Sequence, residues 1–301
     1  MVEDIRQKAV LTHEDILNLN FIRSPGGHFF RRHYRVGLRS HILEVIKIED
    51  LVKEREGISL DGFRWFPRSK PFRMLRIFRT RFDNFRAAEA EMERVKLISH
   101  YLGKSRMAVS QEFVVDYRTD DLTDLLLCGL QEYVEGEILD PWSSLNEKSL
   151  LILLKRMTSD PHERPEIDAE KWINRLRINL QSFCDAVKKM IVEAGYIPDL
   201  AGVGNLMISC KGDIKLVDIN NISEVHFDPE VYLDDKGYPV CDKSIQALAR
   251  LERKPIGRDA VQSDTLYKHF LNPIRIKTVE FLEREFHSLA AYKSSYPASG
   301  V

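Results

Sequence analysis

The N-terminal part of the chain alternates apolar and polar residues in the manner of β-strands, and His41 to Ile48 is rich in the β-branched residues that favour strands. A turn-rich segment around Pro67 and Pro71 separates this stretch from the next one. Four strands are predicted, over His41 to Ile48, Phe72 to Arg79, Met107 to Val115 and Leu125 to Tyr133. We therefore expect the N-terminal part to be mainly sheet.

Apolar residues recur at helical spacing in one segment of this part and in most of the remaining chain. The first predicted helix runs to Leu102, and the side chain of Asp83 or Asn84 can accept hydrogen bonds at its N-terminus. Its apolar positions are Ala88, Met92, Val95 and Leu102. Further helices are predicted over Leu150 to Met157, Ala169 to Ala194 and Ile276 to Tyr292. The C-terminal part is therefore expected to be mainly helical.

One short β-like segment interrupts the helical part. Two apolar runs between Asn205 and Asp218 are joined by the turn-forming residues Lys211, Gly212 and Asp213, which predicts a tight hairpin. The order along the chain is thus a strand-rich part with one helix, a connector at 132–136, and a helical part that contains one hairpin.

The composition is that of a globular protein, because 44% of the 301 residues are hydrophobic and 30% are charged. No apolar run approaches the roughly 20 residues that a transmembrane helix needs. The N-terminus lacks the apolar core and cleavage site of a secretory signal, so we expect a cytoplasmic protein. The cysteines are more than twenty residues apart, unlike those of zinc sites or redox pairs, and we expect free thiols. They are Cys128, Cys184, Cys210 and Cys241.

The formal net charge of −1 conceals two segments of opposite sign. Phe21 to Arg86 contains 16 Lys or Arg and 7 Asp or Glu, whereas Asp116 to Glu170 contains 5 and 14. A near-neutral total argues against an anionic partner only when charge is evenly spread. Because the charge is unevenly distributed, the near-neutral total does not exclude a highly charged ligand.

Three polar residues bracket the predicted hairpin: Asp199 precedes it, Asn205 opens it and Asp218 closes it. Phosphoryl transfer from a nucleotide uses one carboxylate to orient or deprotonate the acceptor hydroxyl, and oxygen ligands to hold magnesium against the phosphates. Magnesium prefers hard oxygen ligands and keeps several waters, so one Asn and one Asp can suffice beside phosphate oxygens. The alternative is that these polar residues serve only the turns of a surface hairpin.

At these residues the chain resembles the protein-kinase-like superfamily, and within it the small-molecule kinases similar to aminoglycoside and choline phosphotransferases. The resemblance implies that Asp199 is the catalytic-loop aspartate and that Asn205 and Asp218 bind Mg²⁺. It implies an α+β, two-lobed fold with an N-lobe of antiparallel β-sheet and one main helix (1–131), a hinge (132–136) and a mostly α-helical C-lobe (137–301). ATP and Mg²⁺ would be the cofactors, and a hydroxyl group of a small molecule or glycan the acceptor.

Two upstream segments extend the resemblance. Leu75 to Arg79 is similar to the strand that carries the phosphate-binding lysine, and Arg76 occupies the place of that lysine. The helix from Ala87 to Leu102 is similar to the one that supplies its glutamate partner, here Glu91. Lys47 is the alternative to Arg76, ranked second because a helix would not fit between Lys47 and the next strand.

The connector also fits the resemblance. Leu130 to Gly136 is similar to the hinge strand of these kinases. The backbone groups of Glu132, Tyr133 and Val134 would then bind the adenine edge of the nucleotide.

Several departures from the family pattern motivate a second hypothesis, a nucleotide-binding pseudokinase with a regulatory or scaffold role. Arginine replaces lysine at Arg76, and arginine is a planar fork that holds phosphate with different geometry. No Gly-x-Gly-x-x-Gly loop is present, and Ser24 to Phe30 is the best substitute. Ile197 and Pro198 precede Asp199, where the family has His or Tyr before the aspartate.

A third hypothesis is a nucleic-acid-binding protein that uses the basic N-terminal half. Arginines interleaved with aromatic residues suit contact with phosphates and stacking on bases. The residues concerned are Arg31, Arg32, Arg35, Arg64, Arg68 and Arg73 with Phe29, Phe30, Trp65 and Phe66. A solvated surface would explain the same composition, and nucleic acid is the less favoured partner.

Overall fold

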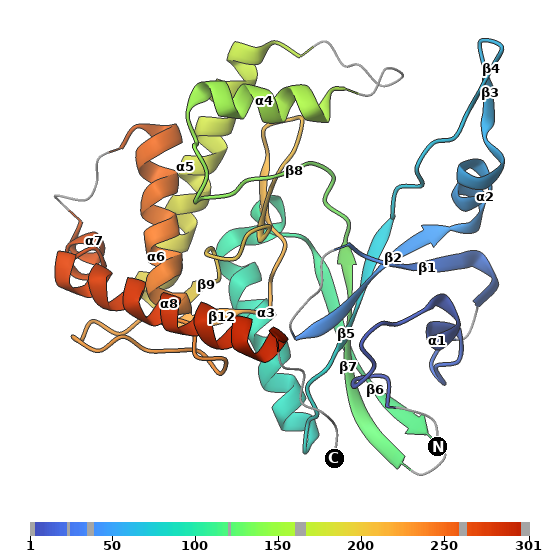
Figure 1. The fold of residues 1–301 in the computed structure, drawn as a ribbon, viewed down its shortest axis with the longest axis horizontal. Coiled ribbons are helices and arrows are strands. Elements are labelled where there is room, and N and C mark those ends of the chain that lie inside the picture. The colour runs from blue at the N-terminus through green and yellow to red at the C-terminus, as the bar shows by residue number, and fades with distance from the viewer. Residues whose placement is uncertain are drawn as a thin grey trace. The chain divides into compact units, whose positions relative to one another are not determined.

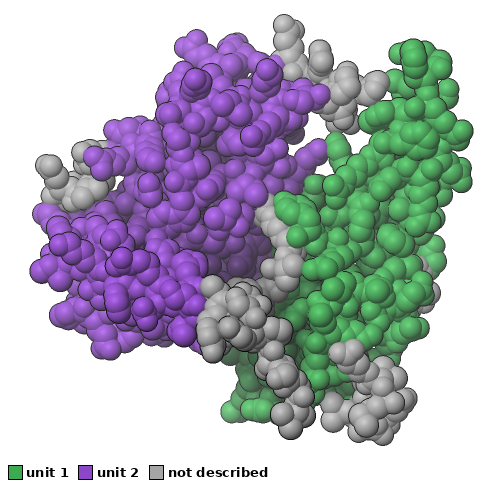
Figure 2. Space-filling view, in the orientation of Figure 1, with its two compact units in different colours: residues 1–93, 108–133 green, residues 94–107, 134–301 purple. Residues whose placement is uncertain are grey.

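The computed structural model describes residues 4–22, 25–34, 39–119, 122–159, 167–258 and 264–295. The chain divides into two compact units, coloured separately in Figure 2. Unit 1 comprises Met1–Glu93 and Ala108–Tyr133, and unit 2 comprises Arg94–Met107 and Val134–Val301. The division between Tyr133 and Val134 falls within the predicted connector at 132–136.

Unit 1 is built on a five-stranded antiparallel sheet. In spatial order its strands are β1 (His28–Arg32), β2 (Ser40–Lys47), β5 (Arg73–Phe78), β7 (Leu122–Glu132) and β6 (Ser110–Thr119). Each of the four strands predicted from the sequence corresponds to one of these strands. Side chains along β5 alternate between the two faces of the sheet. Leu75 and Ile77 lie on one face, where they pack with the N-terminal segment around α1 (His13–Leu17). Phe78 packs instead with Ala88 of α3 (Phe85–Arg106).

A helix and a hairpin that the sequence did not predict lie between β2 and β5. Helix α2 (Ile48–Glu56) begins directly after Lys47, so the reason for ranking Lys47 below Arg76 does not hold. The hairpin pairs β3 (Ile58–Leu60) with β4 (Phe63–Trp65) through an Asp61-Gly62 turn. Both turn residues have positive φ, 48° and 80°, as two-residue hairpin turns that match strand twist require.

Helix α3 belongs to both units, with its first nine residues in unit 1 and the rest in unit 2. Asn84 caps its N-terminus by accepting a hydrogen bond from the backbone N–H of Ala87 at 3.0 Å. Gly103, with φ of 66°, interrupts the helical conformation near the C-terminal end. Val95 and Leu102 are buried in the core of unit 2, in agreement with the predicted apolar face.

Unit 2 is mostly helical, as Figure 1 shows, and its largest helix supplies much of the core. Its helices are α4 (Glu147–Met157), α5 (Ala169–Ala194), α6 (Val240–Leu251), α7 (Thr265–Phe270) and α8 (Pro273–Ser295), with a π-helix at Glu252–Ile256. Asp168 caps α5 by accepting from two backbone N–H groups. Leu176, Leu180, Phe183 and Val187 of α5 are fully buried at helical spacing, which is the amphipathic pattern predicted for that segment.

Short strands complete unit 2. A three-stranded antiparallel sheet has the order β11 (Ile214–Leu216), β10 (Leu206–Ile208) and β8 (Glu137–Ile138), and β9 (Tyr196–Pro198) pairs with β12 (Ile222–Glu224). The β10–β11 pair is the hairpin predicted from the sequence. Gly136 lies close to β10, because a Cβ atom there would stand 2.1 Å from the carbonyl oxygen of Ile208.

The α+β expectation agrees with this mixed architecture, although unit 1 contains the additional short helices α1 and α2 beside α3. The four cysteines are free thiols, and burial raises the pKa of Cys128 to about 12. Among the described residues, no helix combines the length and the apolar character needed to cross a bilayer.

Candidate functional site

Asp199 stands at the end of β9, in a turn whose backbone holds its carboxylate. Pairing of β9 with β12 places it beside Asn221, whose carbonyl oxygen accepts from the Asp199 N–H at 2.9 Å. Oδ1 of Asp199 accepts from the N–H groups of Ala201 and Gly202, at 2.9 and 3.1 Å. Oδ2 accepts from the side-chain amide of Asn221 at 3.0 Å. Three donors therefore fix the carboxylate in one orientation.

Asn205 links Asp199 to the β10–β11 hairpin. Its side-chain Nδ2 donates to the backbone carbonyl oxygen of Asp199 at 3.0 Å. Its backbone carbonyl oxygen accepts from the N–H of Val217 at 2.8 Å. Val217 directly precedes Asp218, so one hydrogen-bonded chain brings together the three residues predicted from the sequence. A Cβ atom at Gly202 would lie 2.6 Å from Nδ2 of Asn205, so a larger residue there would displace the Asn205 side chain.

The two carboxylates interact electrostatically. Burial and the neighbouring charge of Asp218 raise the pKa of Asp199 above its ordinary value, while the N–H donors of Gly202 and Ala201 and the Asn221 amide oppose the shift. Burial and a neighbouring carboxylate are the effects that tune a carboxyl group toward accepting a proton at a functional site.

Removal of the Asn221 amide is expected to raise the pKa of Asp199 further. The hydrogen bond from that amide is stronger to the ionised carboxylate than to the neutral acid, so Asn221→Ala removes a contact that favours the charged form. The measurement is an NMR titration of the labelled Asp199 carboxyl carbon in the full chain. Asn179→Ala, which removes a side-chain amide bonded to the β10–β11 turn, is the matched control and should leave that pKa in place. A pKa that falls or stays constant in Asn221→Ala would contradict this electrostatic account.

Two side chains from distant parts of unit 2 support the Asp199 turn. The indole N–H of Trp142 donates to the carbonyl oxygen of Ala201 at 2.8 Å. The buried hydroxyl of Ser244, in α6, accepts from the N–H of Leu200 at 3.1 Å. Lys243 stacks on Trp142, with Nζ 4.0 Å from the ring centroid, and forms an ion pair with Glu283 at 2.9 Å. These contacts hold the turn at Leu200 and Ala201, the two residues that follow Asp199.

The sequence prediction missed these supporting residues, and for most of them no local signal exists. Trp142 and Ser244 lie 59 and 44 residues from their partners in the turn, so only folding relates them. Asn221 could have been found, because an Asn-Asn pair directly follows the hairpin. Its neighbour Asn220 is 3% exposed, and its side-chain amide has no hydrogen-bond partner among the described residues.

The residues present fit a magnesium ion chemically. Nδ2 of Asn205 is occupied by the Asp199 carbonyl, which leaves Oδ1 as an oxygen ligand, and Asp218 supplies a carboxylate. One amide oxygen and one carboxylate are the hard ligands that Mg²⁺ combines with phosphate oxygens and waters. Within the described ranges, no cluster of three or more His, Cys, Asp or Glu forms a metal site made by the protein alone.

In unit 1, Arg76 and Glu91 are placed on separate elements, β5 and α3. Arg76 is 5% exposed, and its guanidinium donates to Oε1 of Gln131 at 3.2 Å. Glu91 is half-buried on the first part of α3. Lys47 is more exposed: its ammonium lies 3.6 Å from the Glu49 carboxylate at the start of α2, and half of its side chain is accessible.

The connector residues lie at the boundary of the two units. Glu132 is the last residue of β7, and its N–H donates to the Val109 carbonyl at 2.7 Å. Its carboxylate accepts from the Val109 N–H at 3.1 Å. Tyr133 ends the second segment of unit 1 and Val134 resumes unit 2. The proposed glycine-rich substitute is a 3-10 turn at Pro25–Gly27 ahead of β1, and Ser24 lies outside the described residues.

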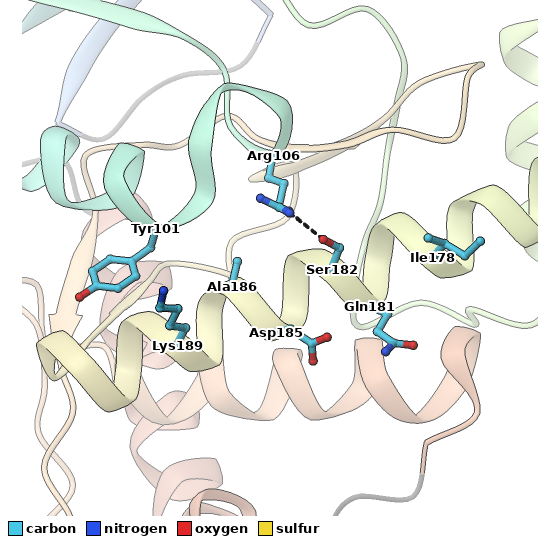
Figure 3. A pocket seen from close by; sticks show the side chains of 8 residues that line it. All are labelled: Tyr101, Arg106, Ile178, Gln181, Ser182, Asp185, Ala186 and Lys189. Atoms are coloured by element: carbon cyan, nitrogen blue, oxygen red, sulfur yellow. Dashed lines mark hydrogen bonds between the residues drawn. The ribbon is translucent and has the colours of Figure 1, made fainter.

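A separate open cavity of about 620 Å³ lies in unit 2 between α5 and the end of α3 (Figure 3). Arg106 crosses it to donate to the Ser182 hydroxyl at 2.7 Å, which anchors the end of α3 on α5. The cavity contains none of the residues predicted for catalysis. Its lining residues are Tyr101, Arg106, Ile178, Gln181, Ser182, Asp185, Ala186 and Lys189.

Comparison with known proteins gives a weak structural similarity to a kinase. No protein-family model matches the chain, and no curated protein matches its sequence. Among solved structures, the chain is similar to one described as "ROP18 kinase domain in complex with AMP-PNP and sucrose". The TM-score is 0.36 at 8% identity, over 87% of this chain and 83% of that one. A TM-score of 0.36 carries no functional argument, so the roles proposed below are argued from the residues of this chain alone.

Proposed function

We propose that this protein is a kinase-like phosphotransferase that moves the terminal phosphoryl group of ATP to a hydroxyl group of a small molecule or glycan. The observation that supports it best is the hydrogen-bonded chain from Asp199 through Asn205 to the residue before Asp218. Turn chemistry alone would not require a half-buried carboxylate that accepts three donors and interacts electrostatically with a second carboxylate.

In this proposal Asp199 accepts or orients the acceptor hydroxyl proton, because a raised pKa makes a carboxylate a better proton acceptor. Asn205 and Asp218 hold Mg²⁺, which when bound neutralises charge on the phosphates. Trp142 and Ser244 are positioning residues, because they act on the backbone next to Asp199. Arg76, with Glu91 as its partner, is proposed to steady the phosphates, and backbone groups at Glu132 to Val134 to bind adenine.

Substitution of Asp218 is expected to remove the magnesium dependence of nucleotide binding. Asp218→Ala deletes one of two proposed protein ligands, so the affinity for Mg-ATP should fall to that for ATP without metal. The measurement is a calorimetric titration of the full chain with ATP, with and without Mg²⁺. Asp213→Ala removes a carboxylate from the turn of the same hairpin and serves as the matched control. Unchanged Mg-ATP affinity in Asp218→Ala would refute the metal assignment.

A second candidate is a nucleotide-binding pseudokinase with a regulatory or scaffold role. The observation that favours it is Arg76, a buried arginine bonded to Gln131 at the place where the family has lysine. An arginine fork holds phosphate with other geometry than an ammonium and can bind a nucleotide without aligning it for transfer. Magnesium-dependent ATP binding without ADP formation, with or without candidate acceptors, would establish this role in place of the enzyme.

A further inference from the structure

The tertiary structure divides the basic N-terminal half into arginines that are used within the fold and a short segment that is displayed. Arg31 forms ion pairs with Glu44 at 2.8 Å and Glu54 at 3.0 Å, and it also donates to the Ser69 carbonyl. Phe30 is 8% exposed in the core of unit 1. Arg35 lies outside the described residues. In this first stretch Arg31 therefore helps to hold unit 1 together, whereas Arg32 is exposed.

The displayed segment is Phe63–Arg73, which we call the arginine-aromatic segment. It consists of β4 and the connection to β5, and in its 11 residues it contains four cations, four aromatic residues and no acid. Its sequence is Phe63-Arg-Trp-Phe-Pro-Arg-Ser-Lys-Pro-Phe-Arg73. In Figure 1 the β3–β4 hairpin extends from the end of α2, away from the sheet of unit 1.

Its aromatic and cationic side chains are exposed together. Phe63, Phe66 and Phe72 are 78%, 57% and 39% exposed, which is unusual for large apolar side chains on a protein surface. The Arg68 side chain is 73% exposed, and its guanidinium lies 3.9 Å from the carboxylate of Glu44. The Arg64 guanidinium lies 6.0 Å from the Phe66 ring centroid, so a cation and an aromatic ring are presented side by side.

We propose that the arginine-aromatic segment binds single-stranded nucleic acid. Cations neutralise phosphates and release counterions, while exposed aromatic rings stack on bases, which only single strands leave accessible. Cations and aromatic residues are interleaved along the segment, so both the phosphates and the bases of one strand have side chains to contact. The proposal concerns unit 1 alone and is independent of the proposed phosphotransfer.

An anionic bilayer is the competing polyanion, and the hairpin tip argues against it. Elements that bind a membrane surface bury aromatic and apolar residues at the interface and present cations to anionic lipids. Here the apex is Asp61-Gly62, so the exposed Asp61 carboxylate would meet the anionic surface first. The cations also continue to Arg73, well beyond the hairpin, where a strand of nucleic acid can follow them.

The first test measures salt dependence. Fluorescence anisotropy with a labelled uridine RNA of about 12 nucleotides, within the usual site range of about 4–16, gives the affinity of the full chain. Neutralisation of four phosphates predicts a loss of roughly 50-fold between about 50 and 200 mM salt, because each contributes a slope of about −0.7. In the triple variant Arg64→Ala, Arg68→Ala, Arg73→Ala the loss over that interval should shrink to about threefold. A control triple variant, Lys148→Ala, Lys155→Ala, Lys277→Ala, removes three exposed unit 2 cations and should behave as the wild type.

The second test separates stacking from charge. Phe63→Leu and Phe66→Leu should each weaken RNA binding about fivefold or more, with the salt slope unchanged, because one stacked base contributes about 1–3 kcal/mol. Both positions are exposed, so the circular dichroism and Tm of these variants should match the wild type. Absence of binding at low salt, equal loss in the control variant, equal affinity for duplex RNA, or tighter binding to phosphatidylserine vesicles would each overturn the proposal.

Discussion

Replacing Asp199 by asparagine is expected to lower the rate of phosphate transfer from Mg-ATP by about 10²–10⁴-fold, the usual contribution of a positioned acid or base. An asparagine oxygen can still accept from the Ala201 and Gly202 N–H groups, so the turn should keep its conformation. The amide cannot accept a proton from an acceptor hydroxyl. The measurement is steady-state formation of ADP from Mg-ATP by the full chain, with water or a candidate alcohol as acceptor.

The matched control for this prediction is Asp185→Asn, which makes the same chemical change at an exposed carboxylate on α5. Its rate should equal that of the wild type. The affinity of Asp199→Asn for Mg-ATP should also be preserved, because Asn205 and Asp218 remain. A rate that does not change in Asp199→Asn would exclude the proposed role of Asp199 and favour the pseudokinase alternative.

Removing the charge of Asp242 is expected to destabilise unit 2 by about 3–5 kcal/mol, the cost of leaving a buried charge without its partner. Asp242 and Arg275 are 1% and 7% exposed, and two hydrogen bonds of 2.5 and 3.1 Å join them. Asp242→Asn preserves the shape of the side chain, so the loss reports charge and not a cavity. The measurement is urea unfolding followed by the fluorescence of Trp142 and Trp172, both in unit 2.

Two further variants make this result specific. Replacing the pair together, by Asp242→Leu and Arg275→Met, should recover most of the lost free energy of unfolding, because no uncompensated charge remains. Lys171→Ala breaks an ion pair whose side chains are 86% and 50% exposed, and it should change stability by less than about 1 kcal/mol. If Asp242→Asn were as mild as Lys171→Ala, the buried pair would contribute little to the fold.

Periodicity in the sequence predicted elements that have one buried side. Helix α5 was predicted over its observed span because one face is continuously apolar and the other is polar. Helix α6 also carries an apolar stripe at helical spacing, with Cys241, Ile245 and Leu248 on one face, so its pattern was a usable signal that the sequence prediction missed. The pattern could not show that the polar residues Asp242 and Lys243 are buried as well, because their partners lie far away in the chain.

The short elements α2, β3 and β4 were not predicted from the sequence, for a different reason. Helix α2 has no side-chain hydrogen bond at its N-cap, Lys47, and the hairpin strands β3 and β4 have three residues each. Neither offers a long periodic run. The Asp61-Gly62 turn was nevertheless a usable signal, because Asp-Gly between apolar residues favours a two-residue hairpin.

The sequence by itself determined the order of the chemical groups: an aspartate, then an asparagine, then a hairpin closed by a second aspartate. That order depends only on local spacing and turn chemistry, which neighbouring residues supply. Only the tertiary structure decided what each charge does, because charges are paired or exposed by residues far away in the chain. It supplied the Trp142 and Ser244 contacts to the Asp199 turn, and it resolved the near-neutral chain with a basic N-terminal half into internal ion pairs and one displayed segment, Phe63–Arg73.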